Sequence, residues 1–102
     1  PQTITTGEVD EDVEGRLVKV SGTVTRMVED DRPYGIKVYV DDGSGETQIF
    51  VHLIDDAPIA PTDGLVMGDL VEAVGLGAQF EETYEVNPRG EADLIEIPVD
   101  GD

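Results

Sequence analysis

Two runs of alternating apolar and polar residues, joined by a glycine-rich stretch, constrain the fold of this chain more than any other feature. The first run is GIKVYVDD at 35–42, and the second is TQIFVHL at 47–53. Alternation with a period of two is typical of a strand with one buried face. A turn such as DDGSGE between two such runs predicts a β-hairpin. The residues expected on its inward face are Ile36, Val38, Val40, Thr47, Ile49, Val51 and Leu53.

Further strands are predicted on both sides of the hairpin. Residues 16–28 are rich in valine, and Gly22 within them marks a bend. Residues 68–80 form another strand, and residues 81–100 begin a strand that NPRG interrupts before it resumes. Two prolines within 54–69 rule out a long helix there and predict a short helical turn or an irregular crossover. The valines expected to face inward from the first of these strands are Val18, Val20 and Val24.

These elements give five strands and no long helix, so the fold class is all-β. Residues 28–35, VEDDRPYG, are predicted to be a loop because charged residues and a proline break the pattern. Five strands at this spacing fit a small closed barrel. A short two-sheet sandwich would give the same pattern, because periodicity alone does not fix closure.

The length of 102 residues predicts one domain. We expect an acidic lead-in with little core to bury over 1–15, a barrel over 16–98, and a tail over 99–102. No apolar run approaches the length of about 18 residues that spans a bilayer, so no membrane partner is expected. The sequence has no cysteine, which excludes disulfides and thiolate metal sites. The first residues carry neither an initiator methionine nor a signal pattern, which favours a mature product or a piece of a longer protein.

The net charge of −18 is the dominant compositional feature. A solvated acidic coat is typical of proteins in salty surroundings, and it favours an extracellular location or the cytoplasm of a salt-adapted organism. Calcium binding is the functional alternative. Affinity for nucleic acid usually comes from Lys and Arg, so an acidic chain must bind a polyanion through a local basic or aromatic patch.

Four segments resemble OB-fold domains of the bacterial and archaeal nucleic-acid-binding type. They are VKVSGTV at 18–24, YVDDGSGETQIFV at 39–51, GDLVEAVG at 68–75 and TYEVNPR at 83–89. The resemblance implies a five-stranded OB-type Greek-key barrel, with the short irregular or one-turn helical segment between its third and fourth strands. Such domains occur within larger, often secreted, multidomain proteins. The resemblance also implies single-stranded nucleic acid as the ligand class.

The outward face of the predicted hairpin is the candidate binding surface. In OB folds the face of the second and third strands binds ligands, and aromatic rings on such a face can stack on bases. Lys37 would meet a phosphate and Gln48 a base edge. The alternative is that the lead-in, a neighbouring domain or a protein partner covers the aromatic rings. The candidate nucleic-acid-binding residues are Arg26, Arg32, Lys37, Tyr39, Gln48, Phe50 and His52.

Acidic residues dominate the two loops expected to flank this face, VEDDRP at 28–33 and AQFEET at 78–83. Acids near a phosphate repel it, less so when salt screens them. Any nucleic-acid binding would therefore rest on stacking and be weak. The alternative role is a protein-interaction or spacer domain of a larger secreted or halophilic protein.

No catalytic or metal site is predicted. His52 is the sole histidine, so no two-histidine metal site can form. The sequence also offers no Ser/His/Asp constellation and no second histidine for nucleophilic or relay chemistry. The DDGSGE stretch lacks the ligand spacing of a calcium loop, and its glycines suit a tight turn. We therefore expect a binding module that is not an enzyme and carries no cofactor.

Overall fold

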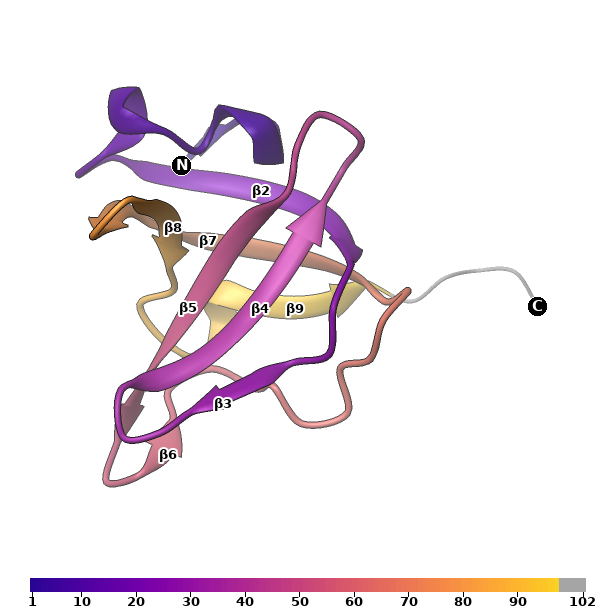
Figure 1. Cartoon of the computed structure of the whole chain (residues 1–102), viewed down its shortest axis with the longest axis vertical. Coiled ribbons are helices and arrows are strands. Elements are labelled where there is room, and N and C mark those ends of the chain that lie inside the picture. Colours follow the sequence, from indigo (N-terminus) through magenta and orange to yellow (C-terminus); the bar gives the residue numbers. More distant parts are fainter. Residues whose placement is uncertain (98–102) are drawn as a thin grey trace.

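A computed structural model describes residues 1–97, and five of its strands close into a small barrel (Figure 1). Each strand pairs with the next in the order β2, β4, β5, β8, β7, and β7 pairs with β2 to close the ring. All of these pairings are antiparallel except that of β5 with β8. The barrel strands are β2 (Leu17–Val24), β4 (Gly35–Asp41), β5 (Thr47–Ile54), β7 (Leu70–Phe80) and β8 (Thr83–Asn87).

This strand order is that of the OB fold, so the predicted all-β, five-stranded OB-type barrel is confirmed. Because the sheet closes on itself, the alternative of a two-sheet sandwich is excluded. Gly22 lies where β2 leaves β7 and approaches β4, and a Cβ on it would sit 3.0 Å from the backbone of Asp41. The predicted bend at this glycine therefore permits the close crossing of two strands.

Seven shorter elements complete the structure. The predicted loop at 28–35 contains β3, which pairs with β4, so that prediction is wrong in part. The strand predicted over 16–28 ends at Val24. The last barrel residue predicted, Pro98, and the predicted tail at 99–102 lie outside the described residues. The shorter elements are β1 (Gln2–Thr3), η1 (Thr6–Glu8), η2 (Glu11–Val13), β3 (Glu29–Asp31), β6 (Ala57–Pro58), η3 (Glu91–Asp93) and β9 (Leu94–Ile97).

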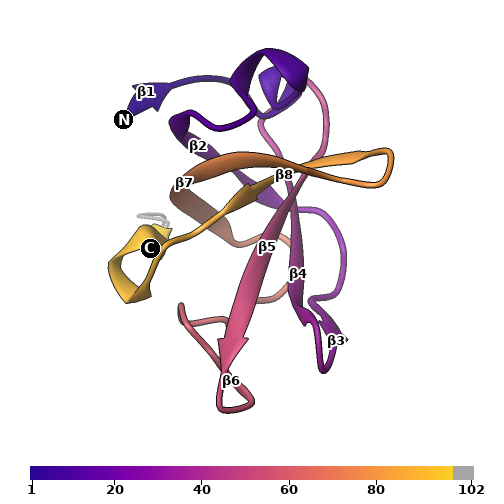
Figure 2. The ribbon, with the colours of Figure 1, turned by 90° about the vertical axis from the view of Figure 1, so that its left-hand side faces the viewer.

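The N-terminal segment closes one end of the barrel. Figures 1 and 2 place it beside the β4–β5 turn, with β3 and β6 at the opposite end. Ile4, Val9 and Val13 are buried in the core, so the expectation that residues 1–15 bury little is wrong. Their apolar side chains are too few and too widely spaced to show a strand or helix period, which is why the sequence alone did not reveal their burial.

Thr6 joins the N-terminal segment to the hairpin turn through hydrogen bonds. Its hydroxyl donates to Asp42 Oδ1 at 3.0 Å and to the carbonyl of Gly45 at 2.6 Å, and its amide donates to Asp42 Oδ2 at 3.0 Å. The amide of Gly7 donates to Ser44 Oγ at 2.8 Å. DDGSGE is therefore a turn whose carboxylate holds the N-terminal segment in place.

Stability is expected to fall in acid because of Asp42. Hydrogen bonds from the Ser44 side chain and from the backbone amides of Thr6 and Ser44 lower its pKa from 3.8 to about 2. A depressed carboxyl pKa stabilises the fold above the unfolded value, and this stabilisation is lost as the pH falls from about 4 towards 2. Denaturant midpoints of Asp42→Asn should lie below those of the wild type at pH 6 and converge with them near pH 2. Asp63→Asn, in an exposed turn, is the control, and a gap for Asp42→Asn that stays constant with pH would contradict this account.

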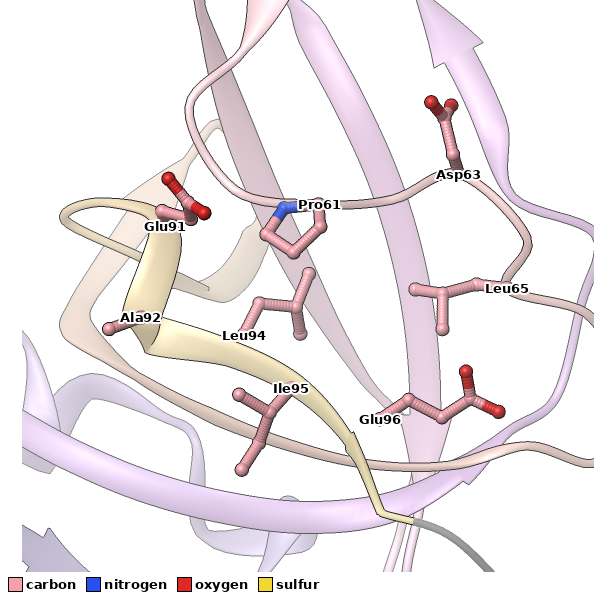
Figure 3. A pocket seen from close by; sticks show the side chains of 8 residues that line it. All are labelled: Pro61, Asp63, Leu65, Glu91, Ala92, Leu94, Ile95 and Glu96. Carbon is pink, nitrogen blue, oxygen red and sulfur yellow. The ribbon is translucent and has the colours of Figure 1, made fainter.

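The crossover between β5 and β7 contains no helix and, apart from the two residues of β6, is irregular, which confirms the irregular form of that prediction. Its Pro61 and Leu65 face Leu94 of β9 across a shallow cavity of about 580 Å³ (Figure 3). The residues that the structure describes form no helix with the length and apolar character needed to cross a bilayer.

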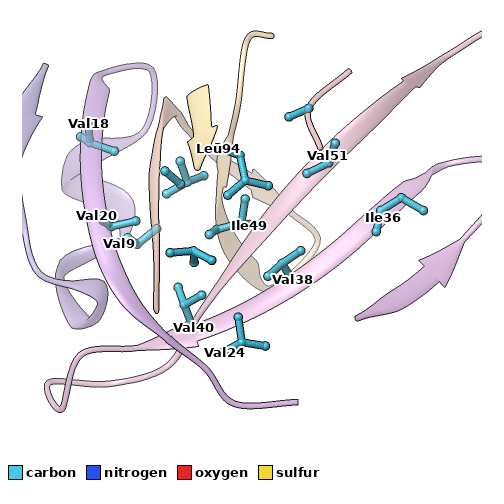
Figure 4. Close-up of a cluster of buried hydrophobic side chains, with 14 of the residues drawn as sticks. Val9, Val18, Val20, Val24, Ile36, Val38, Val40, Ile49, Val51 and Leu94 are labelled. Carbon is cyan, nitrogen blue, oxygen red and sulfur yellow. The ribbon is translucent and has the colours of Figure 1, made fainter. Parts of the chain in front are cut away.

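The core consists of the inward side chains of the barrel strands together with Ile4, Val9, Val13, Ala60 and Leu94 (Figure 4). Val38, Ile49 and Val51 are fully buried, and so are the three valines predicted to face inward from β2. Leu53 is only partly buried, because it lies near the end of β5. The predicted inward face of the hairpin is therefore correct, and the opposite face is left available for a site.

Candidate ligand-binding groove

The outward residues of the β4–β5 hairpin lie together, as the alternation predicted. Lys37 pairs with Phe50, and Tyr39 pairs with Gln48, directly across the two strands. His52 lies opposite Gly35 at the end of the same face. Side chains on one face of paired strands are neighbours, so these positions form one continuous surface.

A groove of about 540 Å³ runs over this surface. β4 and β5 form its floor, β8 contributes to one side, and residues near the two flanking turns form its rims. We call it the aromatic groove. Its lining residues are Asp31, Tyr34, Lys37, Gln48, Phe50, His52, Phe80 and Glu85.

Gly35 sets the position of Phe50 in the groove. A Cβ on Gly35 would lie 2.5 Å from the ring of Phe50, so this ring packs against the bare backbone of β4. The ring of His52 meets that of Phe50 edge-on, with the ring centroids 5.0 Å apart and the planes at 77°. Edge-to-face pairs of this kind are favourable. Phe50 is therefore held in a fixed orientation on the groove floor.

Gln48 and Glu85 form a buried polar pair beside Phe50. Gln48 Nε2 donates to Glu85 Oε1 at 2.8 Å, and the two residues are only 7% and 5% exposed. Burial raises the pKa of Glu85, and the hydrogen bond from Gln48 opposes part of that rise. Gln48 was predicted to face outward, which is correct, but the parallel strand β8 covers it.

Three of the predicted binding residues lie outside the groove lining. Arg26 stacks over the ring of Tyr39, 4.2 Å from its centroid, and binds both carboxylate oxygens of Glu46. Tyr39 is therefore covered by Arg26 rather than open to a ligand. Arg32 lies beside Asp30 and Asp56 and lines a different cavity. The structure thus does not bring Arg26, Tyr39 or Arg32 into the groove.

Carboxylates neutralise the basic side chain within the groove. Lys37 Nζ lies 3.5 Å from Asp31 Oδ2 and 3.6 Å from Glu29 Oε2. Partial burial acts to lower the pKa of Lys37, but these two carboxylates and Tyr39 more than offset it, so its pKa is raised. Within residues 1–97, five of the six basic side chains are ion-paired, and they are Lys19, Arg26, Arg32, Lys37 and Arg89.

Comparison with known proteins supports the OB fold. No protein-family model matches the sequence, and no curated protein is significantly similar to it. The structure of OBody AM1L10 bound to hen egg-white lysozyme is 19% identical, with a TM-score of 0.75 and coverage of 97% of both chains. The hypothetical protein ygiW from E. coli is 14% identical, with a TM-score of 0.62 over 95% of this chain and 91% of that one.

A third similar structure is an aspartyl tRNA synthetase from Entamoeba histolytica. It is 12% identical, with a TM-score of 0.65, and the match covers 96% of this chain but 23% of that one. At such low identity these matches establish the fold and nothing about the ligand.

The two loops expected to flank this face contribute Asp31 and Phe80 to the groove, although neither residue was singled out as a binding residue, and the sequence did not reveal Tyr34 or Glu85. Tyr34 and Phe80 are 72% and 65% exposed, and each stands at the edge of a flanking turn. An aromatic residue among the acids of a loop is the signal in the sequence that points to these two positions. Glu85 gave no local signal, because its place depends on the parallel pairing of β8 with β5.

The aspartates of the hairpin turn are already hydrogen-bonded within the protein. Asp41 Oδ1 accepts from the amides of Gly43 and Gly45, and Asp42 accepts from Thr6 and Ser44. Over residues 1–97, no three His, Asp or Glu side chains gather where they could hold a metal ion. The aspartates of the turn therefore have a structural role, because they hold the turn and the N-terminal segment together.

The acidic surface is expected to make stability depend on salt. Self-repulsion at a net charge of −18 destabilises the compact state, and salt screens it. The melting temperature should therefore rise from low salt to molar NaCl. Scanning calorimetry at several salt concentrations measures this rise, and a flat or falling melting temperature would rule out self-repulsion as a major destabilising term.

Proposed function

We propose that this chain is a non-catalytic module that binds single-stranded nucleic acid in the aromatic groove. One observation carries the proposal: three of the five aromatic side chains, Tyr34, Phe50 and Phe80, line this groove together with the sole histidine. The cavity beside β9, of similar volume, is lined by aliphatic and acidic residues instead. Aromatic rings on a floor and on two rims are what successive bases need for stacking.

The charge of the groove defines how this binding would work. Because Lys37 is paired with two carboxylates, few counterions are released when a phosphate approaches it. Stacking then supplies the affinity, on the order of 1–3 kcal/mol per base. Salt weakens ordinary nucleic-acid binding, but here it mainly screens repulsion. We therefore expect an affinity that stays constant or rises with salt.

A protein partner is the second candidate for the same groove. Lys37 and Arg32 each lie beside two carboxylates, so the charge around the groove stays negative. Negative charge repels phosphates, and this favours a protein over a nucleic acid. Among similar folds, one is bound to lysozyme and one forms part of an enzyme named for tRNA.

The groove is tested by removing its two most exposed rings. Tyr34→Ala and Phe80→Ala should each weaken binding of labelled oligo-dT and oligo-rU by about 1–3 kcal/mol, because each removes one stacking surface. Both side chains are mostly exposed, so the fold should be unaffected. Met67→Ala is the matched control, since Met67 is 59% exposed and lies in the crossover, outside the groove lining.

Fluorescence anisotropy in low and molar salt provides the readout. Binding that weakens in the two aromatic variants, but not in Met67→Ala, supports the proposal. If no single strand binds at protein concentrations near millimolar, the nucleic-acid proposal fails and a protein partner becomes the better candidate. Equal losses in all three variants would also count against the groove.

A further inference from the structure

We propose that the buried pair of Gln48 and Glu85 makes the aromatic groove prefer guanine over thymine and uracil. This inference rests on the proposed function and names the base that the groove would favour. It concerns Gln48 and Glu85, two buried polar residues to which base stacking alone gives no role.

Glu85 is a carboxylate in an unusual place. It is only 5% exposed, yet it lines the groove beside Gln48 and Phe50. A buried carboxylate is costly unless it is hydrogen-bonded. One bond is present, from Gln48 Nε2 to Oε1 at 2.8 Å. Among residues 1–97, no donor is hydrogen-bonded to Oε2, which leaves this oxygen of a groove-lining residue able to accept a hydrogen bond from a ligand.

The Gln48–Glu85 pair offers a defined set of hydrogen-bonding groups. An ionised carboxylate is acceptor-only, with about four lone-pair sites on its two oxygens. The Gln48 amide nitrogen carries two hydrogens, of which one is used by Glu85. Within the pair, one amide hydrogen and the carbonyl oxygen of Gln48, Oε2 of Glu85 and the remaining lone pair of Oε1 are therefore left for a ligand.

Guanine complements this set better than thymine or uracil does. Its Watson–Crick edge carries the O6 acceptor followed by two neighbouring donors, N1–H and N2–H₂. Thymine and uracil carry one donor, N3–H, between two carbonyl oxygens, and these oxygens would face the carboxylate. Recognition of single strands commonly uses this edge of bases that are stacked on aromatic rings. A base held on Phe50 would bring its edge to the neighbouring Gln48–Glu85 pair.

The test uses labelled oligo-dT in which one central nucleotide is changed. A central dG should lower the Kd of the wild-type protein by a factor on the order of ten relative to dT, as expected for one good bidentate contact. A central deoxyinosine lacks only the 2-amino group of guanine, so it should lose most of that gain. Using a single dG avoids the self-association of guanine runs.

Glu85→Gln is the matched protein variant. It keeps the size of the side chain and an acceptor for Gln48, but it replaces the second acceptor with a donor. In this variant the Kd values for dT and dG should become equal, whatever the affinity for oligo-dT itself. Its melting curve checks that the fold is intact, and the inosine comparison on the wild type stands even if the variant is unstable.

The outcomes separate this inference from the proposed function. Equal Kd values for dT, dG and deoxyinosine would overturn the guanine preference and leave the proposed function in place. A dG preference that persists in Glu85→Gln would assign it to other residues and likewise overturn the inference. If no oligonucleotide binds, the proposed function fails, and the inference fails with it.

Discussion

Replacing Ile49 with alanine is expected to lower the free energy of unfolding by about 2–5 kcal/mol. Ile49 lies in the centre of β5 and is fully buried against the other core side chains. The loss combines the transfer energy of the removed methyl groups with the cavity that they leave. Domains of this size are stable by roughly 5–15 kcal/mol, so the variant should melt roughly 10 °C or more below the wild type.

Ile95→Ala is the matched control for this substitution. Ile95 is 46% exposed on β9, so its truncation leaves no enclosed cavity. Urea denaturation of both variants gives the comparison. A loss below about 1 kcal/mol for Ile49→Ala would contradict the packing described for the barrel interior.

Gly75→Ala is the second substitution expected to have a large effect. A Cβ at this position in β7 would lie 2.3 Å from the carbonyl oxygen of Asn87, at the point where β8 ends. The clash is with backbone, which cannot rotate away, so the two strands must separate. Such overpacking costs about 1–3 kcal/mol or more.

Gly90→Ala carries the same chemical change without the clash. Its backbone is extended, and no atom lies within 4 Å of the added Cβ, so it should melt close to the wild type. Thermal unfolding followed by circular dichroism compares the two alanine variants. Equal melting temperatures would mean that β7 and β8 do not approach each other as closely as described.

The hairpin and its two faces could be predicted from sequence because their signal is local. Alternation over a few residues assigned Val38 and Ile49 inward and Lys37 and Phe50 outward, and the structure agrees. Shifting a strand by one residue would exchange its faces, so the core fixes the register. The closed strand order also agrees with the family that the sequence resembles.

The parts that the sequence did not reveal depend on contacts between distant residues. Glu85 meets Gln48 across a parallel pairing of strands 37 positions apart. Arg26 was expected to bind a ligand, but Glu46, 20 positions away, binds it instead. Thr6 reaches Asp42 across 36 positions, which is why residues 1–15 looked like a separate lead-in. Charge and residue type suggest which side chains are able to bind a ligand. Only the folded structure shows which of them are already paired with another residue of the chain.

An NMR titration tests the central claim, that the aromatic groove is the binding site, most directly. Amide spectra of the labelled protein would be recorded while oligo-dT is added at molar salt. We expect the largest shift changes at Tyr34, Phe50, His52 and Phe80, which line the groove. Changes centred instead on Leu65 and Ile95, which line the cavity beside β9, or no changes at all, would contradict the account.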